Sequence, residues 1–283
     1  FKKQLFSTIQ FPVPNKYRIP KGFTLTDYQN DCLEKMEKRF SKDNSIAAFI
    51  MESGAQMAGG VIIYPKDFQR NISKLCKKHD ILFVLDEIAT GFGRLGSMVQ
   101  YKEQKSIPDI VAYGKMLTGG YLTMAATLSS KKIYDSFSGE FNQWKHLFHG
   151  HTYTGNPIAA SVANQNILMY EKYNLIKKIQ KTSKIFSQYY DDISAIDIVG
   201  DIRHKGMLMG IELVSNKKKK IPIQTKKSIN KVFFEEGKKN GIYLRTLGNI
   251  VMLVPPLSIE ENELELLLKK TIKTIQAAKS HII

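Results

Sequence analysis

The chain has 283 residues, of which 43% are hydrophobic and 24% charged, an ordinary balance for a globular protein that excludes a disordered polymer. Its formal net charge is +16, from 42 Lys and Arg against 26 Asp and Glu. Only six of those 42 side chains are Arg, the residue that most often reads bases and clamps phosphates, and the densest basic run (residues 217–227) contains no aromatic side chain for stacking. The charge therefore indicates a lysine-rich solvated surface, and we expect no nucleic-acid partner.

The sequence also argues against a membrane anchor, a disulfide framework and a metal site. No apolar run approaches the roughly 18 residues that a membrane-spanning helix needs. Cys32 and Cys76 are too few for a disulfide framework, which favours a reducing, cytoplasmic location. His146, His149 and His151 lie close together, but no Cys, Asp or Glu beside them completes a metal site, so we predict no metal.

The first half of the chain alternates helices with buried strands. Helical spacing of apolar residues covers 27–40, and Pro65 opens a second helix that runs to about His79. Short apolar runs typical of buried strands cover 46–52, 81–87, 108–114 and 122–128. Strands that are apolar on both faces and alternate with helices predict an α/β fold with a mostly parallel sheet.

The second half, after Pro157, has a different rhythm. We expect two long helices over 158–173 and 175–194, strands near 197–203 and 207–214, a helix near 225–240, strands within 242–254 and a terminal helix from Ile259. This pattern is typical of a smaller α+β unit. We therefore predict a large domain over residues 1–175, and a bridging helix with a small C-terminal domain over 176–283.

Two polar residues each follow a buried strand, where ligands of open α/β sheets bind. Asp86 lies at the carboxyl end of FVLDE (83–87), and by itself is either a site residue or the N-cap of the element that follows. Lys115 follows PDIVAYG with no other charge from 111 to 130; apolar surroundings would make its amine a usable nucleophile, although a loop lysine extending into solvent is equally compatible. Together they match what pyridoxal phosphate enzymes need: a lysine to bind the aldehyde and an acid facing the pyridine nitrogen.

Three segments carry a resemblance to a known family. FVLDEIATGFGRLG (83–96), PDIVAYGKMLTGGYLTMAATL (108–128) and FHGHTYTGNPIAASVA (148–163) resemble the class III aminotransferases in order and spacing. The resemblance is continuous from about residue 45 to 256. It implies a fold-type I transferase that binds pyridoxal 5'-phosphate and works as a homodimer whose active site is shared across the interface.

The resemblance implies a role for each matching residue around the cofactor. Lys115 would bind the aldehyde and then move the proton between substrate and cofactor carbons. Asp86 would pair with the pyridinium nitrogen, and Ile88 would pack against the ring. Gln56 matches the residue near the phenolic oxygen, although this chain has Glu52-Ser53 where the family usually has Glu-Pro.

The segment HGHTYTGN (149–156) resembles one that reaches the partner subunit's cofactor. Thr152 would bind the phosphate, with His151 beside it and Gly150 lining the substrate channel. Many relatives carry Pro at the position of His151, so the resemblance implies no firm role for its side chain.

Two of the rare arginines are candidates for binding substrate. Arg245, in GIYLRTLGN, matches the residue that binds the substrate carboxylate, and a guanidinium suits a carboxylate because it can donate two parallel hydrogen bonds. The next residue is Thr246, where relatives usually have Pro. Arg94, in GFGRLG, is a second candidate at the substrate end, or else a surface loop arginine.

The implied activity is a ping-pong transamination. Within the class, the match is nearest to enzymes that convert the keto acid 8-amino-7-oxononanoate to 7,8-diaminononanoate in biotin biosynthesis, with S-adenosylmethionine or lysine as amino donor. The alternatives are an ornithine- or acetylornithine-type ω-aminotransferase, or a catalytically incomplete basic binding protein. Because family members run well over a hundred residues longer at the N-terminus and this chain begins at Phe1, we expect a fragment without the family's N-terminal part.

Overall fold

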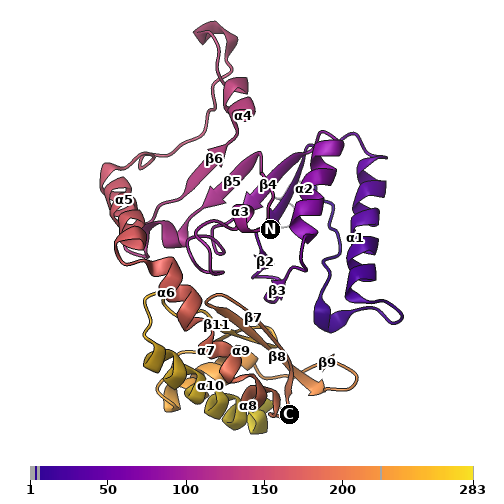
Figure 1. Cartoon of the computed structure of the whole chain (residues 1–283), viewed down its shortest axis with the longest axis vertical. Coiled ribbons are helices and arrows are strands. Elements are labelled where there is room, and N and C mark those ends of the chain that lie inside the picture. Colours follow the sequence, from indigo (N-terminus) through magenta and orange to yellow (C-terminus); the bar gives the residue numbers. More distant parts are fainter. Residues whose placement is uncertain (1–3, 5–6, 224, 283) are drawn as a thin grey trace.

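The computed structural model describes residue 4 and residues 7–223 and 225–282, which form two large sheets with their helices and a small two-stranded sheet (Figure 1). The first sheet has the order β1–β4–β5–β6. Strands β1 (Ala48–Glu52), β4 (Leu82–Asp86) and β5 (Ile110–Tyr113) run parallel, whereas β6 (Ala126–Ser129) is antiparallel to β5. This confirms the predicted α/β class with a mostly parallel sheet.

Two helices of the first part pack together beside this sheet. Helix α1 (Leu25–Phe40) begins at Thr24, whose hydroxyl accepts from Asp27 N–H while the Asp27 carboxylate accepts from Thr24 N–H, a capping box that satisfies two otherwise unpaired donors. Helix α2 (Phe68–Lys78) follows the short hairpin of β2 (Ala55–Gln56) and β3 (Ile62–Ile63), and α3 (Gln100–Glu103) lies between β4 and β5 in the chain. The predicted helices over 27–40 and 65–79 are confirmed to within a few residues.

An extended arm separates β6 from the long helix α5 (Pro157–Lys172) (Figure 1). The arm, residues 130–156, contains α4 (Lys131–Ser136) and the 3-10 turn η4 (Phe141–Gln143). It projects away from both sheets, and from Lys131 onward nearly all its side chains are exposed. The chain then re-enters the fold at α5, where Asn156 caps the helix and Pro157 occupies its first turn.

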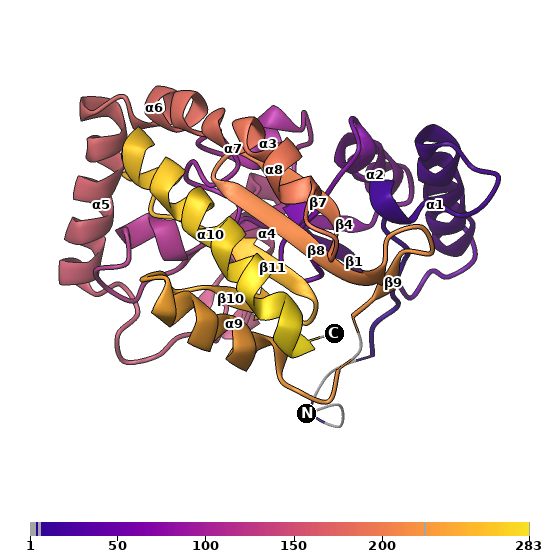
Figure 2. The same ribbon diagram turned by 90° about the horizontal axis from the view of Figure 1, so that it is seen from below.

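The C-terminal part is built on an antiparallel sheet of order β10–β11–β8–β7, with β9 pairing to β8. Its strands are β7 (Val199–Lys205), β8 (Leu208–Asn216), β9 (Ile221–Pro222), β10 (Arg245–Leu247) and β11 (Ile250–Leu253). Helices α9 (Ile229–Lys239) and α10 (Glu261–Ile282) cross one face of it (Figure 2). The predicted α+β character is confirmed; the domain boundary at residue 175 stays a prediction. No helix among the described residues has the length and apolarity needed to span a bilayer.

The prediction of a single long helix over 175–194 is wrong. The structure has three short helices instead: α6 (Leu175–Thr182), α7 (Ile185–Gln188) and α8 (Tyr190–Ser194). At the breaks, backbone N–H groups bond three residues back, as in Phe186 N to Ser183 O and Tyr189 N to Phe186 O, both 3.3 Å. Such 3-10 bonds tighten the turn and end each α-helical run, while the apolar periodicity continues across the breaks.

The two parts of the molecule meet along the amino-terminal end of β8. A small apolar cluster lies here, formed by Ala55, Met57, Val61, Leu95, Leu208 and Ile250. Gly206 lies at the closest approach: its φ is +58°, and a Cβ there would lie 2.4 Å from Leu95 C and 2.6 Å from Arg94 O. Both are backbone atoms, so no side-chain rotation can relieve the overlap.

Gly206→Ala is therefore expected to lower the free energy of unfolding by about 3 kcal/mol, measured by urea denaturation. Gly248→Ala is the matched control, because Gly248 has a similar φ of +57° but no atom within 4 Å of the position that a Cβ would take. That variant should lose only about 1 kcal/mol, the cost of a left-handed backbone for an L-residue. Equal losses in the two variants would show that the contact between the two parts adds nothing.

Candidate active site

The carboxyl ends of β1, β4 and β5 meet at one edge of the parallel sheet. The register pairs Glu52 with Asp86 and Asp86 with Ala112, so Asp86 lies on the central strand of the three. Its Oδ1 accepts a hydrogen bond from Ile88 N–H at 2.8 Å, which folds the loop after β4 back over the strand end. Asp86 is half-buried, so its carboxylate borders solvent at this edge.

Lys115 begins the 3-10 turn η3 (Lys115–Thr118) directly after β5. Its φ is +43°, a left-handed conformation that is uncommon for a residue with a side chain and that occurs disproportionately at functional sites. Asn166 of α5 stabilises the turn, because its Nδ2 donates to Met116 O at 2.7 Å and to Leu117 O at 3.1 Å. The predicted apolar surroundings are wrong within this chain, since the Lys115 side chain is exposed.

Ile88 lies between these two residues. A Cβ added to Gly114 would be 3.2 Å from Ile88 Cγ2, so the Ile88 side chain covers the residue before Lys115. Because Ile88 is also hydrogen-bonded to Asp86, the structure brings together three of the predicted site residues: Asp86, Ile88 and Lys115.

Glu52 is a member of this edge that the sequence analysis did not assign to the site. Its Oε2 accepts from Met57 N–H at 2.7 Å. Burial raises the pKa of the Glu52 carboxyl, the Asp86 carboxylate adds to the rise, and the Met57 N–H and the Lys115 ammonium oppose it. The signal that could have found Glu52 was its place at the carboxyl end of a buried strand, the same signal that singled out Asp86.

Gln56 lies in β2, within the loop that follows Glu52. Its side chain folds over Gly59, where an added Cβ would lie 2.4 Å from Gln56 Cδ. The next residue, Met57, donates to Glu52, so Gln56 belongs to a loop attached to the strand-end edge. Its predicted contact with a cofactor stays a prediction.

Arg94 is buried, with 4% of its surface exposed, so it is not a surface loop residue. Its Nη1 donates to Met207 O at 2.8 Å and to Pro255 O at 2.7 Å. Its Nη2 lies 4.0 Å from the sulfur of Met116, the neighbour of Lys115. Since Nη1 is occupied by backbone carbonyls, this geometry favours a role in holding the structure over direct contact with substrate.

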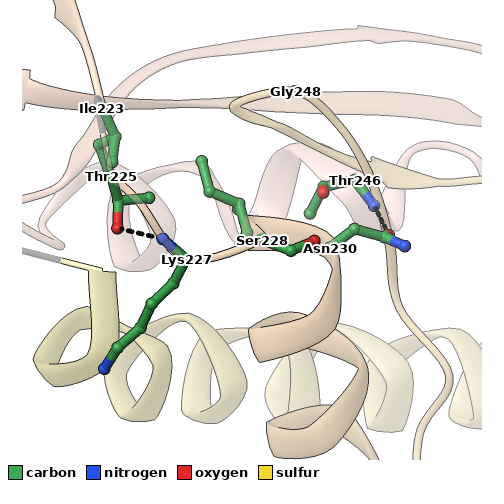
Figure 3. A pocket seen from close by; sticks show the side chains of 8 residues that line it. Ile223, Thr225, Lys227, Ser228, Asn230, Thr246 and Gly248 are labelled. Carbon is green, nitrogen blue, oxygen red and sulfur yellow. Dashed lines mark hydrogen bonds between the residues drawn. The ribbon is translucent and has the colours of Figure 1, made fainter.

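Arg245 is exposed at the start of β10 and forms no ion pair with any residue that the structure describes. The next residue, Thr246, is buried on the opposite face of the strand, and its N–H donates to Asn230 Oδ1 at 3.0 Å. Figure 3 shows the hollow on that face, at the start of α9, where Lys227 N–H also donates to the Thr225 hydroxyl. The hollow is lined by none of the predicted site residues.

Gly150, His151 and Thr152 are exposed in the returning half of the arm. His151 N–H donates to Thr154 Oγ1 at 2.9 Å, and its Nδ1 accepts from Tyr153 N–H at 3.2 Å. Among the described residues, no hydrogen bond or ion pair joins this segment to Asp86, Gln56 or Lys115. Whether this segment contributes to the site formed by the strand-end residues stays a prediction. In the described ranges, no three Cys, His, Asp or Glu side chains are grouped as metal ligands.

The chain is similar in sequence to proteins of known family. The family model "Aminotransferase class-III" matches residues 2–275. A protein of Geobacter sulfurreducens named adenosylmethionine-8-amino-7-oxononanoate aminotransferase is 36% identical over 97% of this chain and 62% of its own length.

Two solved structures share the fold. The enzyme of that same name from Methanocaldococcus jannaschii has a TM-score of 0.83 and 39% identity, covering 88% of this chain and 58% of that one. An omega transaminase from Pseudomonas jessenii, solved in complex with PMP, has a TM-score of 0.88 and 27% identity over 95% of this chain and 60% of that one. The chain thus spans about three fifths of the length of the relatives it matches.

Proposed function

Because this chain belongs to the class III aminotransferases, we propose that the protein carrying it is a pyridoxal phosphate-dependent aminotransferase. The observation that supports this most directly is that Asp86 ends a central parallel strand and Lys115 begins a left-handed turn after the strand beside it. We propose 8-amino-7-oxononanoate as the acceptor, 7,8-diaminononanoate as the product in biotin biosynthesis, and S-adenosylmethionine as the donor, with lysine as the alternative. The names of the relatives support this choice.

The donor set at the strand-end edge fits pyridoxal phosphate. Asp86 uses one carboxylate oxygen for Ile88 N–H, which leaves the other for a protonated ring nitrogen. Lys115 presents an exposed primary amine that makes no ion pair with a described residue, as binding an aldehyde requires. The Ile88 side chain provides an apolar surface between the two.

When bound, pyridoxal phosphate supplies a ring that accepts electrons from the substrate carbon. Asp86 would keep the ring nitrogen protonated, because a carboxylate beside it favours the charged form. Lys115 Nζ would hold the aldehyde carbon covalently and, once released by the incoming amine, carry the proton to and from the substrate carbon. Ile88 would orient the ring by packing on one face, and Gln56 would donate to its phenolic oxygen.

Arg245 would bind the carboxylate of the acceptor. It is exposed and has no acidic partner among the described residues, so its guanidinium can donate two hydrogen bonds to an incoming anion. No step of proton transfer is assigned to it. Its contribution would be orientation, which holds the keto carbon at a fixed position relative to Lys115.

The arm is the basis for proposing a homodimer. It exposes seven large apolar side chains that the rest of the described chain does not cover: Tyr134, Phe137, Phe141, Trp144, Leu147, Phe148 and Tyr153. Exposed apolar groups on this scale mark an interaction surface. In a dimer, Gly150, His151 and Thr152 would line the partner's site, with the Thr152 hydroxyl and N–H on the cofactor phosphate.

We propose a cytoplasmic location because both cysteines are free thiols. Cys32 and Cys76 are both buried as free thiols, and burial raises the pKa of Cys32 to about 11 and that of Cys76 to about 12, so both remain protonated and unreactive. Free structural thiols are usual for proteins of a reducing compartment.

A second substrate class is proposed because an omega transaminase is among the solved structures that share the fold. The Pseudomonas jessenii omega transaminase covers 95% of this chain with a TM-score of 0.88, against 88% and 0.83 for the Methanocaldococcus jannaschii enzyme. An omega-amine such as ornithine or acetylornithine is therefore the alternative substrate. Sequence identity, 39% against 27%, favours the first proposal.

One preparation tests these proposals. The protein carrying this chain, reconstituted with pyridoxal phosphate, should develop a visible absorption band, and borohydride reduction followed by peptide mapping should mark Lys115. It should form 7,8-diaminononanoate with one of the two donors and sediment as a dimer. A colourless protein would overturn the enzyme proposal, whereas colour with turnover of ornithine alone would select the second substrate class.

A further inference from the structure

Arg94 connects the loop after β4 to the C-terminal sheet through both its backbone and its side chain. Its carbonyl accepts from Met207 N–H at 2.8 Å, and its Nη1 donates to Met207 O at 2.8 Å and to Pro255 O at 2.7 Å. Met207 directly precedes β8, and Pro255 lies two residues beyond β11. One guanidinium nitrogen therefore holds the ends of two neighbouring antiparallel strands.

The strand ends that Arg94 holds belong to the same sheet as β10, the strand that carries Arg245. The register pairs Arg245 on β10 with Met252 on β11, and Met252 with Gly210 on β8. Pro255 is three residues beyond Met252. The backbone that carries Arg245 is thus connected to the strand end of Asp86 by a short path: the β10–β11 hairpin, Pro255 O, Arg94 and the loop from residue 86 to 94.

Arg94 is an expensive residue to bury for this contact. Only 4% of it is exposed, and no carboxylate pairs with it in the described part of the chain. Burial lowers the pKa of Arg94 to about 10, which still leaves it charged at neutral pH. A buried charge without a counter-ion is destabilising, so an apolar side chain would serve better if packing were its only role.

Arg203 provides a comparison within the same molecule. It comes from the other part, on β7, is 9% exposed, and its Nη2 donates to Gly60 O at 2.8 Å. Unlike Arg94 it has carboxylate partners, Asp201 at 2.8 Å and Glu212 at 2.6 Å. Arg203 therefore joins the same two parts at a different place, the loop after Gln56, with no bond to the β10–β11 hairpin.

We propose that Arg94 is a positioning residue for Arg245: by holding Met207 O and Pro255 O it sets where the carboxylate-binding guanidinium stands relative to the Asp86–Lys115 edge. This inference rests on the proposed function, in which Arg245 recognises the acceptor's carboxylate. It makes Arg94 a determinant of specificity for acidic substrates that does not itself touch substrate.

The test compares 8-amino-7-oxononanoate with its methyl ester as acceptor in Arg94→Met, Arg94→Lys and Arg203→Met variants of the holoenzyme. The wild type should prefer the acid. In Arg94→Met, the acid-to-ester ratio of kcat/KM should fall by about tenfold or more, mainly through a higher KM for the acid, with the visible absorption band unchanged. Arg94→Lys, which keeps a donor but not the fork, should show a smaller fall, and Arg203→Met should keep the wild-type ratio.

The outcomes separate this inference from the function it rests on. If Arg94→Met loses acid and ester activity equally, Arg94 only supports the fold and the inference fails while the aminotransferase proposal stands. If Arg203→Met lowers the acid-to-ester ratio as much as Arg94→Met does, the inference also fails. Any weakening of the contact between the two parts would then be enough to lower the ratio. A wild type that aminates the acid and the ester equally refutes the role of Arg245, and one that aminates neither refutes the proposed function.

Discussion

Replacing Lys115 with alanine is expected to reduce turnover at least about 1,000-fold, because the substitution removes both the amine that would hold the aldehyde and the group that would move the substrate proton. Lys115 is exposed and makes no ion pair with a described residue, so the fold should be unaffected. Stopped-flow kinetics give the rate, and borohydride reduction should no longer attach the cofactor to the protein.

Lys105→Ala is the matched control for that variant. Lys105 is also an exposed lysine with a left-handed backbone, at φ +51°. Lys105 lies before β5 in the chain, whereas Lys115 lies after it. The loss of Lys105 removes the same charge and leaves an alanine on the same kind of left-handed backbone, but at the opposite end of the strand. Activity within a factor of two of the wild type is expected there; a Lys115→Ala variant that retained comparable activity would remove Lys115 from the mechanism.

Asp86→Asn is expected to lower kcat about 100- to 1,000-fold, because an amide cannot keep the pyridine nitrogen protonated as a carboxylate does. The amide oxygen can still accept the hydrogen bond from Ile88 N–H, so the loop after β4 should keep its place. The measurements are kcat, the dissociation constant of the cofactor and the thermal midpoint of the cofactor-free protein, and only the last should stay unchanged.

Asp109→Asn is the control for the charge change. Asp109 immediately precedes β5, at the opposite edge of the same sheet, and its Oδ2 accepts from Phe83 N–H at 2.8 Å, so its carboxylate also caps a backbone donor. Substitution there should leave kcat within a factor of two. Equal losses in the two variants would mean that Asp86 acts through the sheet and not through a bound group.

Local patterns were sufficient to find the strands and the two central site residues. The apolar runs over 81–87 and 108–114 contain β4 and β5; Asp86 is the last residue of β4, and Lys115 directly follows the second run. A strand carries its own signal in a few consecutive residues, and the position of a site at strand ends follows from the parallel arrangement of the strands. The same rule, applied to the run over 46–52, would have included Glu52.

The sequence by itself determined the α/β class, the family and the strand-end pair, because each depends on residues close together in the chain. Only the tertiary structure decided what Arg94 does: its partner Pro255 is 161 residues away, and no local period reports a contact of that separation. The same holds for the arm, whose apolar side chains resemble core residues in the sequence and are exposed in the fold. Whether a side chain is buried depends on which segments pack against it, and segments distant in the sequence come together only in the folded structure.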